Sequence, residues 1–303
     1  MKALYNYAVI GGDMRQVYLA QEVSHFSGRS CCYALCAVPD SSCLNSSSLT
    51  SVTSLKEACS NSQNILCPIP LKRNGFLNQS ALKEQICLEQ LLSVLQEGQS
   101  FFAGNIPPDF RASAAQKGIE VIDFMEDKSL SLFNSIATAE GAICEAIARS
   151  PLNLHKSYCA VLGYGKCGNT LAHYLKRMFC HVYVASDTEE KRTQAEIVAD
   201  KAGSLKEFKT LAGEFDFIFN TIPAFVLTEE VLKKMKSCVT IIDIASAPGG
   251  VDFQAAQRLG IDAALCPGLP GKYAPLSSAR AIKRLIANLS SLKKSPCYHE
   301  RSD

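Results

Sequence analysis

No stretch of this sequence approaches the roughly 18 consecutive apolar residues that a membrane-spanning helix needs. The N-terminus also lacks the layout of a signal peptide, because polar and small residues interrupt it at Asn6, Gly11, Gly12 and Asp13. The net charge is only +2 over 303 residues. This excludes the strong charge bias typical of proteins that bind nucleic acid or membrane surfaces. We therefore expect a cytoplasmic protein.

A metal-binding or disulfide framework is also missing, although the chain has 14 cysteines. No two cysteines have C-x-x-C spacing, and none lies near a histidine at the spacing of a zinc site. Many cysteines fall inside expected strands and helices, where a free thiol behaves as a small apolar residue. We expect reduced, structural cysteines in a reducing cytosol, and no metal site.

What the sequence does contain is a glycine-rich turn in its second half. An apolar run over 159–162 is followed by the spacing G-x-G-x-x-G and then by an amphipathic segment, a pattern typical of a dinucleotide-binding strand, turn and helix. In such a turn Gly163 adopts unusual backbone angles, Gly165 lets a pyrophosphate approach, and Gly168 packs the helix against the strand. The free N–H groups of the helix then face the phosphates. The candidate residues are Gly163, Gly165, Lys166, Cys167 and Gly168.

A second apolar run, over 181–185, ends about twenty residues after this turn, where such folds place the group that meets the adenosine ribose. Asp187 suits the free 2′-hydroxyl of NAD. A 2′-phosphate instead favours small polar residues and cations, which are present at Ser186, Thr188, Lys191 and Arg192. Alternatively, Asp187 or Thr188 caps the following helix and the cations are solvated. The choice between NAD and NADP stays open.

Strands and helices also alternate through the first half of the chain. We expect strands over 7–10, 33–38, 65–68, 101–103 and 120–124, with helices over 15–26, 55–60, 81–96 and 108–117. The Ser-rich stretch 41–54 and residues 72–79 are expected to be surface loops. This alternation predicts a parallel sheet covered on both faces.

The turn after the first strand, G-G-D-M-R, lacks the third glycine that a dinucleotide needs. A turn at the carboxyl end of a strand nevertheless faces the ligand crevice, which makes Asp13 and Arg15 candidates for catalysis and substrate contact. Arg15 can hold a carboxylate in a bidentate pair. Alternatively, Asp13 caps the helix and Arg15 is solvated.

A long helix expected over 129–148 connects the two halves. Its small residues (Ala137, Ala139, Gly141 and Ala142) indicate close backbone packing. Burying the Glu140 carboxylate without a partner among these small apolar residues would cost free energy. We therefore expect Glu140 to lie at a crevice or to form a local cap. We expect residues 138–141 at a cleft between domains, and we regard Glu140 and Asp13 as candidate proton acceptors.

In the second half, strands expected over 215–220, 239–245 and 263–266 each lead into a loop rich in Pro, Gly, Ser or Thr, and helices are expected over 228–235 and 252–259. Such loops let the backbone approach a flat ring, as a nicotinamide site requires. The candidate cofactor residues there are Thr221, Ile222, Pro223 and Ala245.

A final helix over 278–292 is expected to return to the first domain. The fold class is therefore α/β, with two doubly wound, Rossmann-like parallel-sheet domains facing across a cleft. The substrate-side domain is expected over 1–127 plus 275–303, and the NAD(P)-binding domain over 128–274.

Six motifs in order resemble the family of dipicolinate synthase A subunits, relatives of the D-2-hydroxyacid dehydrogenases. They are G-G-D-x-R-Q (11–16), N-S-I-x-T-x-E-G (134–141), G-x-G-x-x-G (163–168), N-T-I-P (220–223), I-A-S-x-P-G-G-x-D-F (244–253) and P-G-L-P-G (267–271). The resemblance implies an NADP-linked oxidation, with NAD possible, that gives dipicolinate from 4-hydroxy-tetrahydrodipicolinate with loss of water. It also implies the mother cell of a sporulating bacterium and a partner, the flavoprotein-like B subunit, with a homo-oligomer possible.

For the small dicarboxylate substrate we expect contacts from Arg15, Ser135, Thr138, Ser246, Gly268 and Lys272. Relatives often carry Arg where this chain has Ala247, and an Arg after the second nucleotide strand where it has Asp187. Two alternatives stay open: a D-2-hydroxyacid dehydrogenase and a nucleotide-binding subunit without catalysis. The first needs a histidine base and an arginine after the strand at 239–245, and neither is evident.

Overall fold

The computed structural model describes residues 3–25, 28–39 and 48–294, and the chain divides into two compact units. Unit 1 comprises Met1–Phe133 and Ala274–Asp303, and unit 2 comprises Asn134–Tyr273. The sequence predicted that the first unit ends at residue 127. In the structure it continues into helix α6 (Lys128–Arg149), because Leu130 is buried in the core of unit 1.

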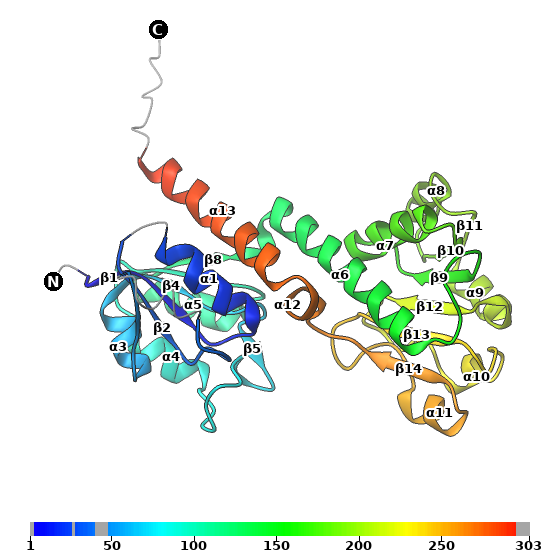
Figure 1. Ribbon diagram of the computed structural model, residues 1–303, viewed down its shortest axis with the longest axis horizontal. Coiled ribbons are helices and arrows are strands. Elements are labelled where there is room, and N and C mark those ends of the chain that lie inside the picture. Colours follow the sequence, from blue (N-terminus) through cyan, green and yellow to red (C-terminus); the bar gives the residue numbers. More distant parts are fainter. Residues whose placement is uncertain (1–2, 26–27, 40–47, 295–303) are drawn as a thin grey trace, which may run out of the picture. The chain divides into compact units, whose positions relative to one another are not determined.

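Unit 1 contains a six-stranded parallel sheet in the order β3-β2-β1-β4-β7-β8 (Figure 1). The strands are β1 (Tyr5–Ile10), β2 (Ser30–Tyr33), β3 (Leu49–Ser51), β4 (Ser62–Leu66), β7 (Ser100–Ala103) and β8 (Glu120–Asp123). A short hairpin, β5 (Lys72–Arg73) and β6 (Phe76–Leu77), follows β4. The strand order reverses between β1 and β4, so the loops after these two strands flank the position where such sheets bind ligands.

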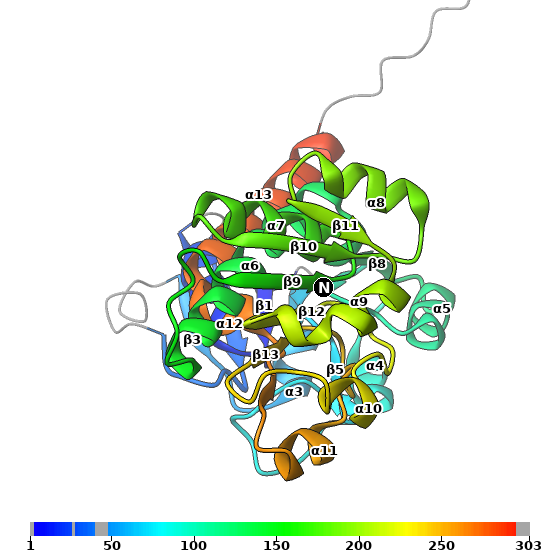
Figure 2. The same cartoon turned by 90° about the vertical axis from the view of Figure 1, so that its right-hand side faces the viewer.

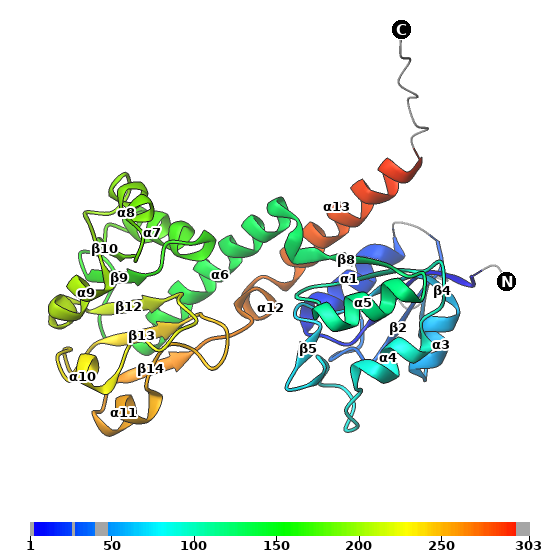
Figure 3. The ribbon, with the colours of Figure 1, turned by 180° about the vertical axis from the view of Figure 1, so that it is seen from behind.

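Helices cover both faces of this sheet (Figure 3). One core cluster lies under α1 (Met14–Ser24) and α13 (Pro275–Lys294), and the other lies under α3 (Leu55–Ser60), α4 (Leu88–Val94) and α5 (Pro108–Gln116). The helix α13 packs against α1 through Ala279, Ile282 and Ile286. Glu22 of α1 accepts hydrogen bonds from Arg280 and Lys283 of α13, at 2.9 and 2.8 Å.

Unit 2 repeats the arrangement, with the strand order β11-β10-β9-β12-β13-β14 (Figure 2). Its strands are β9 (Tyr158–Leu162), β10 (His181–Ala185), β11 (Lys201–Gly203), β12 (Phe217–Asn220), β13 (Thr240–Asp243) and β14 (Asp262–Leu265). All five pairings are parallel. The order reverses between β9 and β12, next to the glycine-rich turn. The two parallel-sheet α/β domains predicted from the sequence are therefore confirmed.

The helices of unit 2 again form two layers. The helices α6, α7 (Lys166–Arg177), α8 (Glu189–Glu196) and α12 (Leu269–Tyr273) contribute to one core cluster, and α9 (Leu205–Leu211), α10 (Glu229–Leu232) and α11 (Phe253–Arg258) contribute to the other. Short 3-10 turns follow β8 (Phe124–Glu126) and α9 (Ala212–Glu214). Among the helices that the structure describes, none is long and apolar enough to cross a membrane.

Several predicted elements were wrong in position. The strand expected over 33–38 is Ser30–Tyr33, because the chain turns at Ala34, where φ is 57°. The Ser-rich stretch contains β3, a three-residue edge strand. The helix expected over 81–96 is only Leu88–Val94, because the Cys87 side chain accepts a capping hydrogen bond from the Gln90 N–H. Residues 40–47 lie outside the described residues.

Candidate functional site

The three glycines after β9 each have a distinct local environment. Gly163 has a φ of 91°, and a side chain there would overlap the Thr221 hydroxyl. A side chain on Gly168 would overlap the carbonyl oxygen of Gly163. A Cβ on Gly165, in contrast, would meet no atom within 4 Å. The turn is therefore tightly folded at its two ends and open in its middle, as a backbone that receives a ligand must be.

The helix α7 begins directly after Gly165, and no side chain caps its N-terminus. Lys166, Cys167 and Gly168 form its first turn, and the N–H groups of Cys167 and Gly168 have no acceptor within the helix. The N–H groups of Cys167 and Gly168, the positive end of the helix dipole and the open space at Gly165 fit the pyrophosphate of a dinucleotide. Burial raises the pKa of the Cys167 thiol. The thiol therefore stays neutral and adds no negative charge beside the phosphates.

On the adenosine side, Arg192 organises the loop that follows β10. Its Nη1 donates to the carbonyl oxygens of Ser186 and Asp187, both at 2.9 Å. Ser186 is buried, whereas Asp187 and Thr188 are exposed. Thr188 is the N-cap residue of α8, but its side chain makes no capping hydrogen bond. The alternative that Thr188 serves mainly as a helix cap is therefore not supported.

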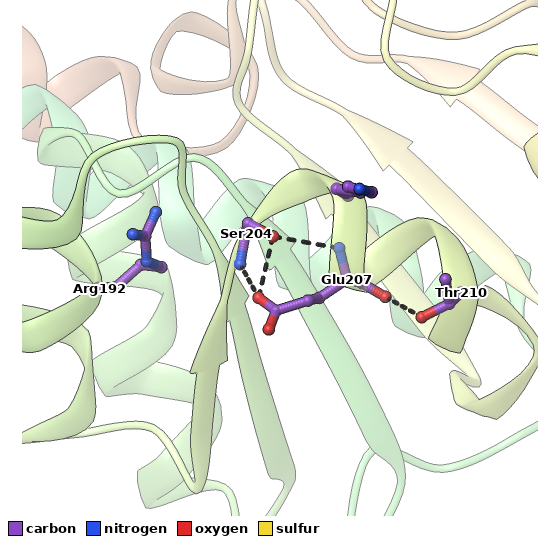
Figure 4. Close-up of a pocket in the computed structure, with 5 residues that line it drawn as sticks. Arg192, Ser204, Glu207 and Thr210 are labelled. Atoms are coloured by element: carbon purple, nitrogen blue, oxygen red, sulfur yellow. Dashed lines mark hydrogen bonds between the residues drawn. The ribbon is translucent and has the colours of Figure 1, made fainter.

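A hollow of about 550 Å³ lies beside this loop, lined by Arg192, Ser204, Lys206, Glu207 and Thr210 (Figure 4). Ser204 and Glu207 form a capping box at the start of α9, with the Ser204 N–H donating to Glu207 at 2.6 Å. The hydrogen bonds from Ser204 lower the pKa of Glu207. Two basic side chains and one ionised acid therefore border the place where a ribose is expected.

The loops after β12 and β13 lie on the other side of the glycine-rich turn. Thr221 donates from both its N–H and its hydroxyl to the carbonyl oxygen of Leu162, at 2.9 Å each. Thr221 and Ile222 are half-buried, and Pro223 is exposed. After β13, Ala245 is buried and Ser246 is exposed. The predicted cofactor residues of these loops therefore follow two neighbouring strands, and Thr221 and Ile222 lie against Gly163 of the turn.

A fully buried polar pair beneath these loops was missed by sequence reasoning. Asn220 and Asp243, the last residues of β12 and β13, are both 0% exposed. The Asn220 amide donates to the Asp243 carboxylate at 3.0 Å. The sequence signals were an acid and an amide at the ends of two largely apolar strands, and the place of Asn220 in the N-T-I-P motif.

Three residues of α6 that were expected at the substrate have partners within unit 2. Ser135 shares a hydrogen bond with the Thr170 hydroxyl at 2.9 Å, and Thr138 donates to the Asn134 carbonyl oxygen at 2.8 Å. Glu140 is exposed and accepts a hydrogen bond from the Tyr174 hydroxyl at 3.0 Å. Their roles at the substrate stay predictions.

The close packing predicted for α6 occurs against α12. A Cβ on Gly141 would lie only 2.8 Å from Leu269 and 2.9 Å from Tyr273, so only glycine fits. The Glu145 carboxylate accepts hydrogen bonds from the Lys272 ammonium at 2.5 Å and the Tyr273 hydroxyl at 2.9 Å. Lys272, expected to contact substrate, is thus held by Glu145. Gly268 is exposed, with a φ of 70°.

We expect Glu145→Gln to lower the free energy of unfolding by about 1–2 kcal/mol at neutral pH, because it removes a charge-assisted bond at a buried carboxylate. The hydrogen bond from Lys272 lowers the pKa of Glu145 from 4.5. Its contribution is therefore present above about pH 4.5 and is lost as the pH falls through the folded-state value. Unfolding of both proteins, measured from pH 3 to 8, should show the difference shrinking at acid pH. Glu230→Gln, at an exposed site, is the control and should change stability little.

In unit 1, Asp13 and Arg15 form an ion pair at the strand-order reversal. The Arg15 Nε donates to Asp13 Oδ1 at 2.9 Å, and Nη2 donates to Asp13 Oδ2 at 2.7 Å and to the Ile69 carbonyl oxygen at 2.6 Å. Ile69 follows β4, so Arg15 connects the loops after β1 and β4. Arg15 is only 5% exposed. Asp13 also caps α1, since the Arg15 N–H donates to it.

This geometry changes two expectations for the pair. The bidentate edge of Arg15 is occupied by Asp13, so Nη1 is the nitrogen without a hydrogen bond to any described residue. Both Asp13 oxygens accept hydrogen bonds from Arg15. Asp13 therefore orients the guanidinium and is poorly placed to remove a proton. Within the described part of the chain, no three His, Cys, Asp or Glu side chains group as metal ligands do.

Comparison with known proteins assigns both units. The family model for the N-terminal domain of dipicolinate synthase A subunits matches residues 6–125, and the NAD binding domain of D-isomer specific 2-hydroxyacid dehydrogenases matches residues 135–255. The crystal structure of the dipicolinate synthase A subunit from Bacillus halodurans superposes with a TM-score of 0.79 at 26% identity, covering 95% of this chain and 98% of that one. Over nearly its whole length the chain is similar to dipicolinate synthase A subunits.

Two further relatives agree with this assignment. The dipicolinate synthase A subunit of Bacillus subtilis (strain 168) is 34% identical over 179 residues, which span 58% of this chain and 59% of that relative. The crystal structure of the dipicolinate synthase A chain from Bacillus subtilis superposes with a TM-score of 0.78 at 25% identity, over 96% of this chain and 98% of that one. The resemblance inferred from the six motifs is confirmed. Unit 2 is a dehydrogenase-type domain for a nicotinamide nucleotide.

Proposed function

We propose that this chain oxidises 4-hydroxy-tetrahydrodipicolinate, with loss of water, to dipicolinate. The observation that carries the proposal is the match of unit 1 to the N-terminal domain of dipicolinate synthase A subunits, in the same chain as an open glycine-rich turn. Loss of water gives a dihydropyridine, and loss of a hydride and a proton then makes the ring aromatic. The bound nicotinamide supplies the hydride acceptor. Because aromatisation is downhill, the protein mainly has to position the ring.

Unit 1 is proposed to hold the substrate through Arg15. The guanidinium is buried, and Asp13 and the Ile69 carbonyl oxygen fix its orientation, which leaves Nη1 to donate to a substrate carboxylate. Ser246 and Gly268 are exposed at loop ends of unit 2, and they stay in the proposal as substrate contacts. Glu140, whose carboxylate is exposed, stays the proposed proton acceptor.

We propose NADP as the preferred coenzyme, because Arg192 is fixed in the loop after β10, where dinucleotide-binding folds place the adenosine ribose. Its Nη1 is held by two backbone carbonyl oxygens, while Nε and Nη2 donate to no described residue and can meet a 2′-phosphate. Lys206 lines the same hollow and adds positive charge. Asp187 opposes a 2′-phosphate and permits NAD as the weaker alternative.

Arg192→Gln tests this coenzyme preference. We expect the Kd for NADPH to rise about 10- to 100-fold, because one charge-assisted bond to phosphate is lost, and the Kd for NADH to change less than about threefold. Fluorescence titration with both coenzymes measures the two values. Arg258→Gln, which removes an exposed guanidinium of the same unit that is paired with Glu229, serves as the matched control. An equal loss for NADPH and NADH would contradict the proposed phosphate contact.

The relatives are named as A subunits, and we propose that this chain likewise works with a B subunit, which the family resemblance identifies as flavoprotein-like. We also propose that it acts in the mother cell of a sporulating bacterium. The experiment that tests the proposed function incubates the chain with NADP and freshly generated 4-hydroxy-tetrahydrodipicolinate, with and without the B subunit. Mass spectrometry should detect dipicolinate in at least one mixture. Nucleotide binding without product in either would point to another substrate.

A further inference from the structure

The pair Asn220 and Asp243 is unusual because an acid is fully buried at the end of an apolar strand. Both residues are 0% exposed and lie opposite each other in the register of β12 and β13. No described basic residue forms an ion pair with Asp243. Burying a carboxylate without a counter-charge is costly, so its hydrogen bonds must offset that cost.

All of these hydrogen bonds lead to the loops that follow β12 and β13. Asp243 Oδ1 accepts from the Asn220 amide and the Ala245 N–H, both at 3.0 Å, and Oδ2 accepts from the Gly250 N–H at 2.6 Å. The Asn220 side chain in turn accepts from the Ile222 N–H at 3.1 Å and donates to the Ile222 carbonyl oxygen at 3.0 Å. One carboxylate therefore connects the loop 221–223 to the loop 245–250.

The glycines of the second loop provide an independent observation. Gly249 has a φ of 87°, and a Cβ there would lie 2.6 Å from Asp243 Oδ2. A Cβ on Gly250 would lie 2.6 Å from the Asn220 amide nitrogen and 2.9 Å from the Ile222 carbonyl oxygen. The main chain is therefore folded directly onto the buried pair, with no room for a side chain.

These loops lie at one particular half of the nucleotide site. A dinucleotide spans the point where strand order reverses, which in unit 2 is between β9 and β12. Its adenosine half lies toward the end of β10, where Asp187 and Arg192 are found. Its nicotinamide half therefore lies over the ends of β12 and β13, which the buried pair underlies.

We propose that Asp243 is a positioning residue, whose buried carboxylate holds the loops 221–223 and 245–250 in the arrangement that receives the nicotinamide ring. This inference rests on the proposed nucleotide site and adds a residue that does not itself contact the coenzyme. A carboxylate is required because three N–H groups point at its two oxygens. An asparagine at 243 has the same size, but its NH2 group faces one of these donors, and that contact is lost.

The test compares NADPH with 2′-phospho-ADP-ribose, the same molecule without the nicotinamide ring. We expect Asp243→Asn to raise the Kd for NADPH at least about tenfold and the Kd for 2′-phospho-ADP-ribose less than about threefold. Calorimetric titration measures both ligands. Asp216→Asn is the matched control, because Asp216 adjoins the amino end of β12 and accepts from the Tyr158 N–H at 2.8 Å and Lys236 at 2.6 Å. It should leave both Kd values unchanged.

Equal losses for the two ligands, or no loss for either, would overturn the positioning role of Asp243. If Asp243→Asn is not recovered folded, Asn220→Ser tests the same network from its other member and should show the same selective loss for NADPH. Failure of the unaltered chain to bind either ligand would overturn the proposed function and, with it, this inference. If Asp243→Asn and Asn220→Ser both bound NADPH and 2′-phospho-ADP-ribose with the Kd values of the unaltered chain, this inference alone would be overturned.

Discussion

Replacing Gly165 with valine is expected to abolish binding of nicotinamide nucleotides while leaving the fold intact. A Cβ at this position meets no protein atom within 4 Å, and the backbone is extended with a φ of −82°, which valine adopts without strain. The branched side chain would instead fill the space that we propose for the pyrophosphate against α7. We expect the Kd for NADPH to rise more than about 100-fold, equivalent to roughly 3 kcal/mol. Fluorescence titration and thermal unfolding measure the two effects.

Gly168 provides the contrasting variant. Its Cβ would overlap the Gly163 carbonyl oxygen, so Gly168→Val should destabilise unit 2 by roughly 3 kcal/mol or more. Gly165→Val is expected to lose coenzyme binding, whereas Gly168→Val, three residues further along the chain, is expected to lose stability. Tight NADPH binding by a folded Gly165→Val protein would show that the coenzyme does not lie against this turn.

Arg15→Gln is expected to lower kcat/KM for dipicolinate formation about 100-fold without changing the Kd for NADPH. The guanidinium is buried and already oriented, so its loss removes the charge-assisted bond that we propose to a substrate carboxylate, worth roughly 2–3 kcal/mol. Steady-state kinetics with saturating NADP measure the first quantity, and fluorescence titration measures the second.

Two companion variants make the Arg15 result specific. Arg280 belongs to the same unit, where its side chain is 60% exposed and paired with Glu22. Arg280→Gln should therefore leave kcat/KM unchanged. Arg15→Lys keeps the charge without the planar fork and should fall between wild type and Arg15→Gln. Full activity in Arg15→Gln would remove Arg15 from the substrate site.

The nucleotide-binding turn could be predicted from sequence because its chemistry is local. The spacing predicts a tight turn at Gly163, open space at Gly165 and close packing at Gly168. The structure has all three features. The alternation of strands and helices similarly predicted two parallel sheets. Local patterns of this kind depend on neighbours within a few residues, so they appear in a single sequence.

Other features depend on partners that are distant in the sequence. The sequence around Lys272 offers no acidic partner for it, but in the structure its ammonium group forms a hydrogen bond with Glu145, 127 residues earlier in the chain. Asp243 has no distinctive neighbours in the chain, and its role depends on Asn220 in the adjacent strand. The strands β3 and β11 are only three residues long and take their conformation from pairing at a sheet edge. Tertiary contacts, not local preference, decide such positions.

We propose that this chain forms dipicolinate while it reduces a nicotinamide nucleotide. The most direct test follows NADPH and dipicolinate in one reaction, started with NADP and freshly generated 4-hydroxy-tetrahydrodipicolinate in the presence of the B subunit. We predict one NADPH for each dipicolinate with the unaltered chain, and neither product with Gly165→Val. Dipicolinate formed at the same rate by Gly165→Val, or without any NADPH, would contradict this claim.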